Sequence, residues 1–245
     1  DKEIKTIALT SSIPAEGKTL INVLLSKTYA ELDNKVLLID ADMRKPQLHH
    51  RLGLNNLIGL SNILTDSSLD LNKVIQKVDG YDKWDVITAG INPPDPARLL
   101  SSEKMSQFIS NLKNSYTYDI IIFDTPPVVG LADASLVAEK ADGAILLVTT
   151  EKVPIGLPND AKKIMENSGT EFLGIVINSI KKNETKFLGY EGYGYGYGYG
   201  YGYGSDYIYS NYAKSEKNIS EEKNKRSIAK SINFYMNKIL RWIED

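Results

Sequence analysis

The sequence predicts an α/β fold in which a parallel sheet is flanked by helices. Short apolar, β-branched runs alternate with segments of helical length, and the runs are nearly continuous, as in strands buried on both faces. The first run leads into a Gly-Lys-Thr loop, and two later runs end in aspartates. A chain of 245 residues can form one large domain with a tail.

The apolar runs and the segments between them place the individual elements. Strands are expected at residues 4–9, 36–39, 84–87, 120–123, 144–148 and 172–177. Helices are expected at residues 18–32, 97–114, 132–140 and 156–167. The pattern changes near Lys181, so we predict a nucleotide-binding domain at 1–186, a Tyr/Gly-rich tail at 187–212, and a polar linker with a helix at 213–245.

Composition argues against several classes of protein. The net charge of −2 gives no basic field, so no nucleic-acid partner is expected. No run approaches the ~18 apolar residues that span a bilayer, and neither a membrane span nor a signal peptide is expected. The absence of cysteine fits a reducing cytoplasm. The chain begins at Asp1 without methionine, which suggests that a segment upstream has been trimmed or that the chain belongs to a longer polypeptide.

A phosphate-binding loop follows the first predicted strand. Backbone N–H groups at the helix start face an anion, the Lys18 ammonium bridges phosphate oxygens, and the Thr19 hydroxyl can ligate Mg²⁺. The strict motif has glycine where this chain has Ser12, so a chance match is the alternative. The predicted nucleotide-binding residues of the loop are Pro14, Ala15, Glu16, Gly17, Lys18, Thr19 and Leu20.

Aspartates end two further strands. Asp40 and Asp42 follow the strand at 36–39, and Asp124 follows the strand at 120–123. Ligands bind at the carboxyl ends of parallel strands, so Asp40 and Asp42 can converge on one Mg²⁺–phosphate centre. An acid on the strand beside a phosphate loop typically holds Mg²⁺ directly or through water. Capping and turn-forming roles for these aspartates stay open.

Together these motifs resemble the bacterial tyrosine kinases of capsule and exopolysaccharide synthesis, whose fold is P-loop NTPase-like. The family combines a phosphate loop, an Asp-x-Asp-x-Arg motif, an apolar-Asp-x-Pro motif and a C-terminal tyrosine cluster. Besides the tyrosines, this chain supplies Thr10, Ser11, Pro14, Glu16, Gly17, Lys18, Thr19, Asp40, Asp42, Arg44, Asp124 and Pro126. It departs from the pattern at Ala15, where the family usually has glycine, and it contains no Glu-x-x-Arg-x-x-Arg assembly segment before the first strand.

The resemblance implies a protein-tyrosine kinase that uses ATP and Mg²⁺. In this reading the catalytic residues are Lys18, Asp40 and Asp42. Lys18 neutralises charge on the β- and γ-phosphates, and Asp40 accepts the proton of the incoming tyrosine hydroxyl. The metal is held by Thr19, Asp42 and Asp124. Asn178 contacts the adenine ring, and a structural role for Asn178 is equally open.

The tyrosine–glycine tract is the implied phosphate acceptor. Glycine between the tyrosines removes the steric cost of many backbone conformations, so the tract can enter the cleft of a neighbouring copy. Each phosphate adds about −1.5 to −2 charges, enough to repel adjacent subunits. A low-complexity spacer without an acceptor role is the alternative. The candidate acceptors are Tyr190, Tyr193, Tyr195, Tyr197, Tyr199, Tyr201, Tyr203, Tyr207, Tyr209 and Tyr212.

Residues 228–243 predict an amphipathic helix with basic flanks. Apolar residues recur there at helical spacing, and no acid lies between Lys223 and Arg241. One hypothesis is that the helix docks on an anionic membrane surface or a membrane partner. Packing on its own domain or on a second copy is equally open.

The resemblance also implies partners and a location. It implies a homo-oligomer, with a ring left open, a membrane adaptor of the polysaccharide co-polymerase type, and a tyrosine phosphatase. The location is then cytoplasmic, at the inner face of the cell membrane.

Two alternative functions remain. A Min- or Par-type positioning ATPase shares the fold but carries a lysine where this chain has Ile13. A nucleotide-gated scaffold without enzymatic activity would use the tail for docking.

Overall fold

The computed structural model describes residues 4–115, 117–150 and 153–178. These residues form a seven-stranded sheet of order β3-β4-β2-β5-β1-β6-β7. The strands are β1 (Thr6–Ser11), β2 (Val36–Asp40), β3 (Gln76–Lys77), β4 (Trp84–Ile87), β5 (Ile120–Asp124), β6 (Gly143–Thr149) and β7 (Phe172–Asn178). All neighbours are parallel except β3 and β4. The predicted parallel sheet flanked by helices is thus confirmed, with one antiparallel edge strand added.

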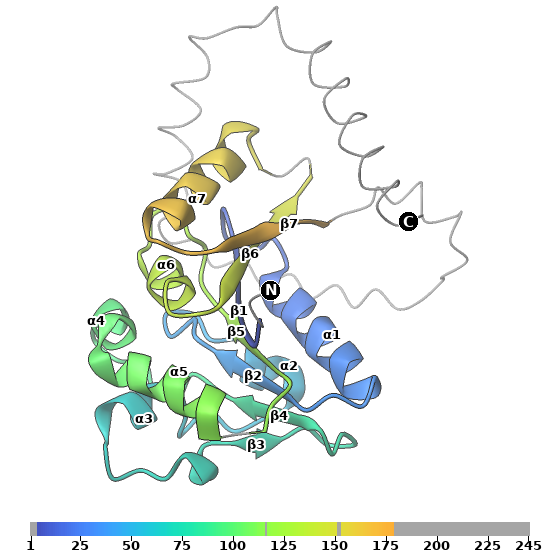
Figure 1. Ribbon diagram of the computed structural model, residues 1–245, viewed down its shortest axis with the longest axis vertical. Helices are drawn as coiled ribbons and strands as arrows, with labels where there is room; N and C mark the ends of the chain where they lie inside the picture. Colours follow the sequence, from blue (N-terminus) through green and yellow to red (C-terminus); the bar gives the residue numbers. More distant parts are fainter. Residues whose placement is uncertain (1–3, 116, 151–152, 179–245) are drawn as a thin grey trace, which may run out of the picture. The chain divides into compact units, whose positions relative to one another are not determined.

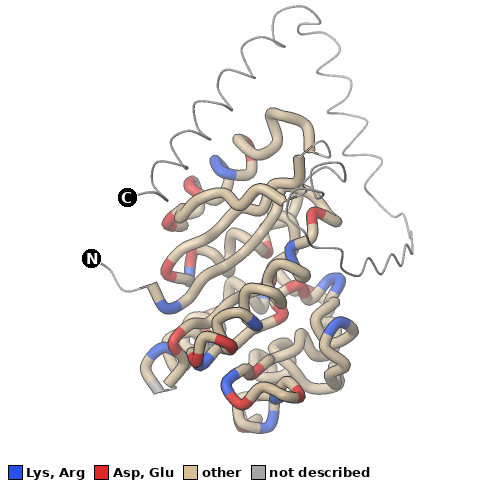
Figure 2. The backbone as a smooth tube through the Cα atoms, turned by 90° about the vertical axis from the view of Figure 1, so that its right-hand side faces the viewer, with Lys and Arg blue, Asp and Glu red and all other residues tan. Residues whose placement is uncertain are grey.

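Helices cover both faces of the sheet (Figure 1). They are α1 (Lys18–Glu31), α2 (Leu48–Leu52), α3 (Leu60–Thr65), the 3₁₀ turn η1 (Leu71–Lys73), α4 (Pro96–Ser101), α5 (Glu103–Ser115), α6 (Asp133–Ala138) and α7 (Gly156–Asn167). The helices α1 and α2 pack on one face, and α3 to α7 pack on the other. Figure 2 shows acidic and basic residues interspersed along the described backbone.

The continuous apolar runs arise because the central strands are buried on both faces. Along β2, Val36 and Leu38 belong to the core under α1, whereas Leu37 and Ile39 belong to the core under the opposite helices. Successive side chains of a strand point to opposite faces, so a strand covered twice needs apolar residues at every position. This packing fixes the carboxyl ends of β1, β2 and β5 at one edge, which we call the carboxyl edge.

The predicted helix at 97–114 is wrong as a single element, because two helices occupy the segment. Ser102 has extended backbone angles, φ −66° and ψ 154°, and separates α4 from α5. The Met105 N–H donates to the Ser102 Oγ at 3.3 Å, so this hydroxyl caps the first turn of α5. Asp95 caps α4 in the same way, through the Arg98 N–H at 3.1 Å.

A buried carboxylate fastens β1 to β6 at the opposite, amino edge of the sheet. Asp142 immediately precedes β6, and its Oδ2 accepts from the N–H groups of Lys5 at 3.0 Å and Thr6 at 2.9 Å. The Thr6 hydroxyl donates to it at 2.8 Å, and the Lys113 ammonium pairs with Oδ1. Burial alone would raise the pKa of Asp142, but the bonds from Lys113 and Thr6 outweigh it and lower the pKa to about 2.

Several predicted features lie outside the described residues. These are the tyrosine tract with its candidate acceptors, the linker and the helix at 228–243. The described residues fall within one compact unit, Asp1–Gly189. Within the described ranges, no helix combines the length and the apolar character that a membrane crossing requires.

Candidate functional site

The carboxyl edge brings the predicted loop and aspartates together. In the sheet register, Asp40 of β2 lies opposite Asp124 of β5, and Leu9 of β1 lies on the other side of Asp124. The strand that ends in Asp124 is therefore the direct neighbour of the strand that leads into the phosphate loop. The two aspartates are adjacent although 84 positions separate them in the sequence.

The phosphate loop has the backbone geometry of an anion cradle. Helix α1 begins at Lys18, and its N-cap, Gly17, is left-handed with φ 95°. No described side chain caps this first turn, so its N–H groups can face a ligand. A Cβ at Gly17 would lie 2.8 Å from the Asn178 Nδ2. Ala15 is also left-handed, with φ 63°, at the position where the family pattern has glycine.

Lys18 lies almost buried among acids. Its exposed fraction is 7 %, and burial lowers the pKa of its ammonium. The nearby charges of Asp124, Asp42 and Glu16 oppose this shift. The acids keep a positive charge favourable at this nearly buried position, next to the loop that would receive phosphate.

The aspartates of the carboxyl edge lie close together, and the nearby lysine and hydrogen-bond donors only partly balance their negative charge. Burial, and next the charge of Asp124, raise the pKa of Asp40 well above its usual value. Burial raises the pKa of Asp124 to about 6, although the Thr19 side chain and the charge of Lys18 oppose the shift. Burial also raises the pKa of Asp42. Asp124 accepts from the Asn22 Nδ2 at 2.7 Å.

Asp40 has a structural task that the sequence did not reveal. It is fully buried, and its oxygens accept from the backbone N–H groups of Asp42 at 3.1 Å, Gln47 at 3.2 Å and Leu48 at 3.1 Å. The last two bonds hold the start of α2. Asp40 thus shapes the loop after β2, whereas Asp42 is half-buried and lies beside Lys18.

These residues fit a metal-bound nucleotide. Two adjacent buried carboxylates beside a single lysine are electrostatically costly, and a divalent cation would relieve that cost. The buried Ser12 Oγ and Asn22 Oδ1 have no hydrogen-bond partner among the described residues. No three acidic, His or Cys side chains of the described part could hold a metal by themselves. Mg²⁺ typically uses one or two carboxylates and completes its shell with phosphate oxygens and water.

Three residues of this region were not predicted from the sequence. Asn22 is fully buried and bonds Asp124, and its spacing of four from Lys18 and Ser26 on α1 was an available signal. Asp133, at the start of α6, accepts the Arg44 guanidinium in two bonds of 2.7 and 3.0 Å. Thr149 contacts the phosphate loop from the end of β6. No local pattern marked Asp133 or Thr149.

Asn178 reaches the site from the end of β7. Its Nδ2 donates to the Glu16 carbonyl at 2.8 Å, so it touches the phosphate loop directly. The predicted adenine contact stays a prediction.

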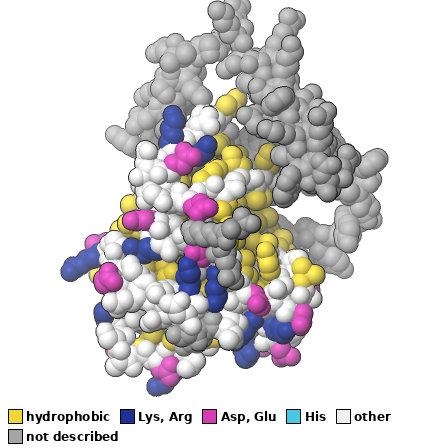
Figure 3. Space-filling model, viewed as in Figure 1, with side chains coloured by type: hydrophobic (Ala, Val, Ile, Leu, Met, Phe, Trp, Pro, Cys, Tyr) yellow, Lys and Arg dark blue, Asp and Glu magenta, His cyan; other side chains and the backbone are white. Residues whose placement is uncertain are grey.

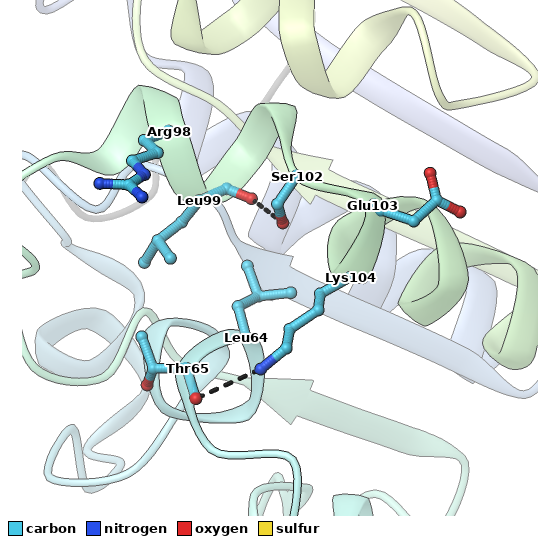
Figure 4. A pocket seen from close by; sticks show the side chains of 7 residues that line it. All are labelled: Leu64, Thr65, Arg98, Leu99, Ser102, Glu103 and Lys104. Atoms are coloured by element: carbon cyan, nitrogen blue, oxygen red, sulfur yellow. Dashed lines mark hydrogen bonds between the residues drawn. The ribbon is translucent and has the colours of Figure 1, made fainter.

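A separate hollow, drawn in Figure 4, lies between α3, α4 and α5. Its volume is about 530 Å³. It is lined by Leu64, Thr65, Arg98, Leu99, Ser102, Glu103 and Lys104. The dashed lines mark the bonds from Lys104 to the Thr65 carbonyl and from Ser102 to the Leu99 carbonyl. None of the predicted site residues lines it.

Comparison with known proteins decides the family. Residues 4–166 match the AAA domain family. Tyrosine-protein kinase YwqD of Bacillus subtilis (strain 168) is 35% identical over 192 residues, which cover 78% of this chain and 79% of that protein. The chain belongs to the bacterial tyrosine-protein kinases. The resemblance drawn from the motifs is thereby confirmed, and so is the enzyme class of protein-tyrosine kinase.

Solved structures agree with this assignment. The kinase domain of Escherichia coli tyrosine kinase ETK is 31% identical with a TM-score of 0.70, covering 80% of this chain and 74% of that one. The chimerical protein CapA2B2 is 31% identical with a TM-score of 0.69, covering 74% and 79%. MinD of Pyrococcus horikoshii OT3, complexed with Mg-ADP, has a TM-score of 0.62 at 22% identity, covering 73% and 71%. It shares the fold alone.

Proposed function

We propose that this kinase transfers the γ-phosphoryl group of Mg²⁺-bound ATP to the tyrosine tract of a neighbouring copy. The observation that carries the proposal is the meeting of Lys18, Asp40 and Asp124 at the carboxyl edge, beside the phosphate loop. The tract at 190–212 offers the acceptor hydroxyls.

The chain's own residues bind and orient the reactants. We assign charge neutralisation on the phosphates to Lys18, because it is nearly buried and begins the helix that follows the phosphate loop. We assign metal binding to Thr19, Asp42 and Asp124, since the Thr19 side chain lowers the pKa of Asp124 from nearby and Asp42 lies beside Lys18. When bound, Mg²⁺–ATP supplies the transferable phosphoryl group and a further positive charge.

Asp40 is the proposed acceptor of the tyrosine proton. A phenol of pKa ~10 stays protonated at neutral pH, so a positioned base assists as attack proceeds. Burial is the main cause of the raised pKa of Asp40, and the raised pKa makes Asp40 a stronger base than an ordinary aspartate. Three backbone N–H groups occupy the Asp40 carboxylate, one on Oδ1 and two on Oδ2, so the remaining lone pair of Oδ1 is the position that can take the proton.

Family membership also supports a proposal about the wider role. We propose that phosphorylation controls capsular or exopolysaccharide synthesis and export. The proposed partners are further copies of the chain, a membrane adaptor of the polysaccharide co-polymerase type and a tyrosine phosphatase. The location is then the cytoplasmic face of the membrane. Family membership supports these points.

A mixing experiment tests transfer between copies. One protein carries Lys18→Met and keeps its tyrosines, and the other keeps Lys18 but has phenylalanine at every candidate acceptor. After incubation with Mg²⁺ and ATP, mass spectrometry should find phosphotyrosine on residues 190–212 of the Lys18→Met chain. Each protein alone should remain unmodified at those positions. ATP hydrolysis without phosphotyrosine in the unaltered protein would contradict the proposal and favour a positioning-ATPase activity.

A further inference from the structure

Glu16 places a carboxylate inside the loop that has to accept a triphosphate. Such a charge repels phosphate unless it is turned away and used elsewhere. Its exposed fraction is 1 %, and no cation forms an ion pair with it among the described residues. A buried carboxylate is retained only where hydrogen bonds compensate its lost hydration.

Each oxygen of the Glu16 carboxylate accepts one backbone N–H group. Its Oε1 accepts from the Ile13 N–H at 2.9 Å, which closes the loop on itself. Its Oε2 accepts from the Thr149 N–H at 2.7 Å, which ties the loop to the end of β6. Both oxygens therefore point into the protein framework.

The Glu16 carbonyl adds two further ties. It accepts from the Thr149 Oγ1 at 2.9 Å and from the Asn178 Nδ2 at 2.8 Å. Four hydrogen bonds thus join this one residue to its own loop and to the ends of β6 and β7. The next residue, Gly17, is left-handed and begins the anion cradle, so the ties act directly on the backbone that faces the phosphates.

We propose that Glu16 is a positioning residue that holds the phosphate loop in its binding conformation before nucleotide arrives. It acts through Ile13, Thr149 and Asn178, without contact between its carboxylate and the nucleotide. The inference rests on the proposed nucleotide-binding function and deepens it. Preorganisation of this kind improves affinity because the loop does not have to be ordered at the moment of binding.

Amide hydrogen exchange in the nucleotide-free protein tests the ties themselves. The Glu16→Gln substitution keeps the size of the side chain but replaces one carboxylate oxygen with an NH₂ group. Because this NH₂ group cannot accept a hydrogen bond, the N–H group of either Ile13 or Thr149 loses its partner. We expect the Ile13 or Thr149 amide to exchange at least tenfold faster than in a matched control, Glu139→Gln, which removes an exposed carboxylate. Exchange rates within twofold of the control at both amides would overturn the proposal.

Nucleotide affinity then separates positioning from general stability. At a temperature where every variant is folded, the Kd of Mg²⁺–ATP should rise about tenfold in Glu16→Gln, with a smaller fall in kcat than in affinity. A merely structural role would lower the Tm and leave that Kd unchanged, which would contradict the inference. If the unaltered protein bound no Mg²⁺–ATP, the proposed function would fail, and hydrogen exchange would still decide the role of Glu16.

A milder pair of variants covers the case in which Glu16→Gln does not fold. Thr149→Val removes the hydroxyl that donates to the Glu16 carbonyl and keeps the Thr149 N–H. We expect a rise of about threefold in the Kd of Mg²⁺–ATP, and Thr149→Ser should restore the affinity. Equal affinities in Thr149→Val and Thr149→Ser would overturn the proposed tie through the carbonyl.

Discussion

Buried carboxylates at the two edges of the sheet have pKa values shifted in opposite directions. At the amino edge, Asp142 receives an ammonium, a hydroxyl and two backbone N–H groups, and its pKa falls to about 2. At the carboxyl edge, Asp124 shares one lysine with neighbouring acids, and burial raises its pKa to about 6. Asp142, whose charge is balanced by several donors, stabilises the fold. The aspartates that share one lysine lie at the candidate site.

We relate this difference in pKa to two separate roles, stability at the amino edge and function at the carboxyl edge. A charge with all its partners contributes to folding, whereas the carboxylates crowded at the carboxyl edge are the ones proposed to hold a cation that arrives with the substrate. Substitutions at the two edges should therefore separate activity from stability, in opposite directions.

The largest expected effect is on catalysis at the carboxyl edge. Asp124→Asn should lower the rate of tyrosine phosphorylation about 10²–10³-fold, because a carboxylate proposed to hold the metal is lost. The variant should be at least as stable as the unaltered protein, since one of two adjacent buried charges is removed. Phosphotyrosine assays and thermal unfolding measure the two quantities. A less stable, fully active variant would reverse the contrast between the edges.

The next effect concerns stability at the amino edge. Asp142→Asn should lower the free energy of unfolding by about 1–3 kcal/mol, because Lys113 loses its partner and several donors lose charge-assisted bonds. Phosphorylation activity at a temperature where the variant is folded should change less than threefold. Urea unfolding checks the stability, with Glu139→Gln as the exposed control. A large loss of activity without loss of stability would place Asp142 in the site instead.

Acid unfolding gives the pH signature of the same carboxylate. The pKa of Asp142 is lowered on folding, so its stabilisation is complete above its unfolded pKa of ~3.9 and is lost as pH falls toward about 2. The unaltered protein should lose about 2 kcal/mol more than Asp142→Asn over this interval. Urea unfolding at pH 5, 4, 3 and 2 measures it. Parallel pH profiles for the two proteins would show that Asp142 does not titrate as described.

The smallest effect is backbone strain in the phosphate loop. Ala15 is left-handed with φ 63°, a conformation that costs a residue with a Cβ about 1 kcal/mol. Ala15→Gly should therefore change stability by no more than about 1 kcal/mol, since relief of strain opposes the added freedom of the unfolded chain. The affinity for Mg²⁺–ATP should stay within threefold. A tenfold change in affinity would show that Ala15 itself sets the loop conformation.

Sequence reasoning captured the central sheet because burial on both faces leaves a strong local pattern. The strand Trp84–Ile87 and the helix Gly156–Asn167 were predicted with their observed bounds. The short helix α2 was missed because its start depends on Asp40, a residue of the preceding strand. The break at Ser102 was missed because a serine inside an amphipathic segment caps a helix only when the chain turns there.

The site shows the same limit. The loop motif and the aspartates were visible because each follows its strand directly. The orientation of Glu16 was not, because its partners Thr149 and Asn178 lie 133 and 162 positions away. The motif predicted Glu16 as a nucleotide-binding residue, and only the tertiary contacts indicate that its carboxylate faces the framework. The pairing of Arg44 with Asp133, 89 positions apart, was hidden for the same reason.

The proposed transfer depends on one arrangement, a metal-bound triphosphate among Lys18, Asp42 and Asp124. Its most direct test is a crystal structure with Mn²⁺ and a non-hydrolysable ATP analogue, in which anomalous scattering locates the metal. We predict one peak bound directly or through water to Thr19, Asp42 and Asp124, with phosphate oxygens on the Lys18 ammonium. A peak away from these side chains, or a triphosphate bound elsewhere on the domain, would contradict the account.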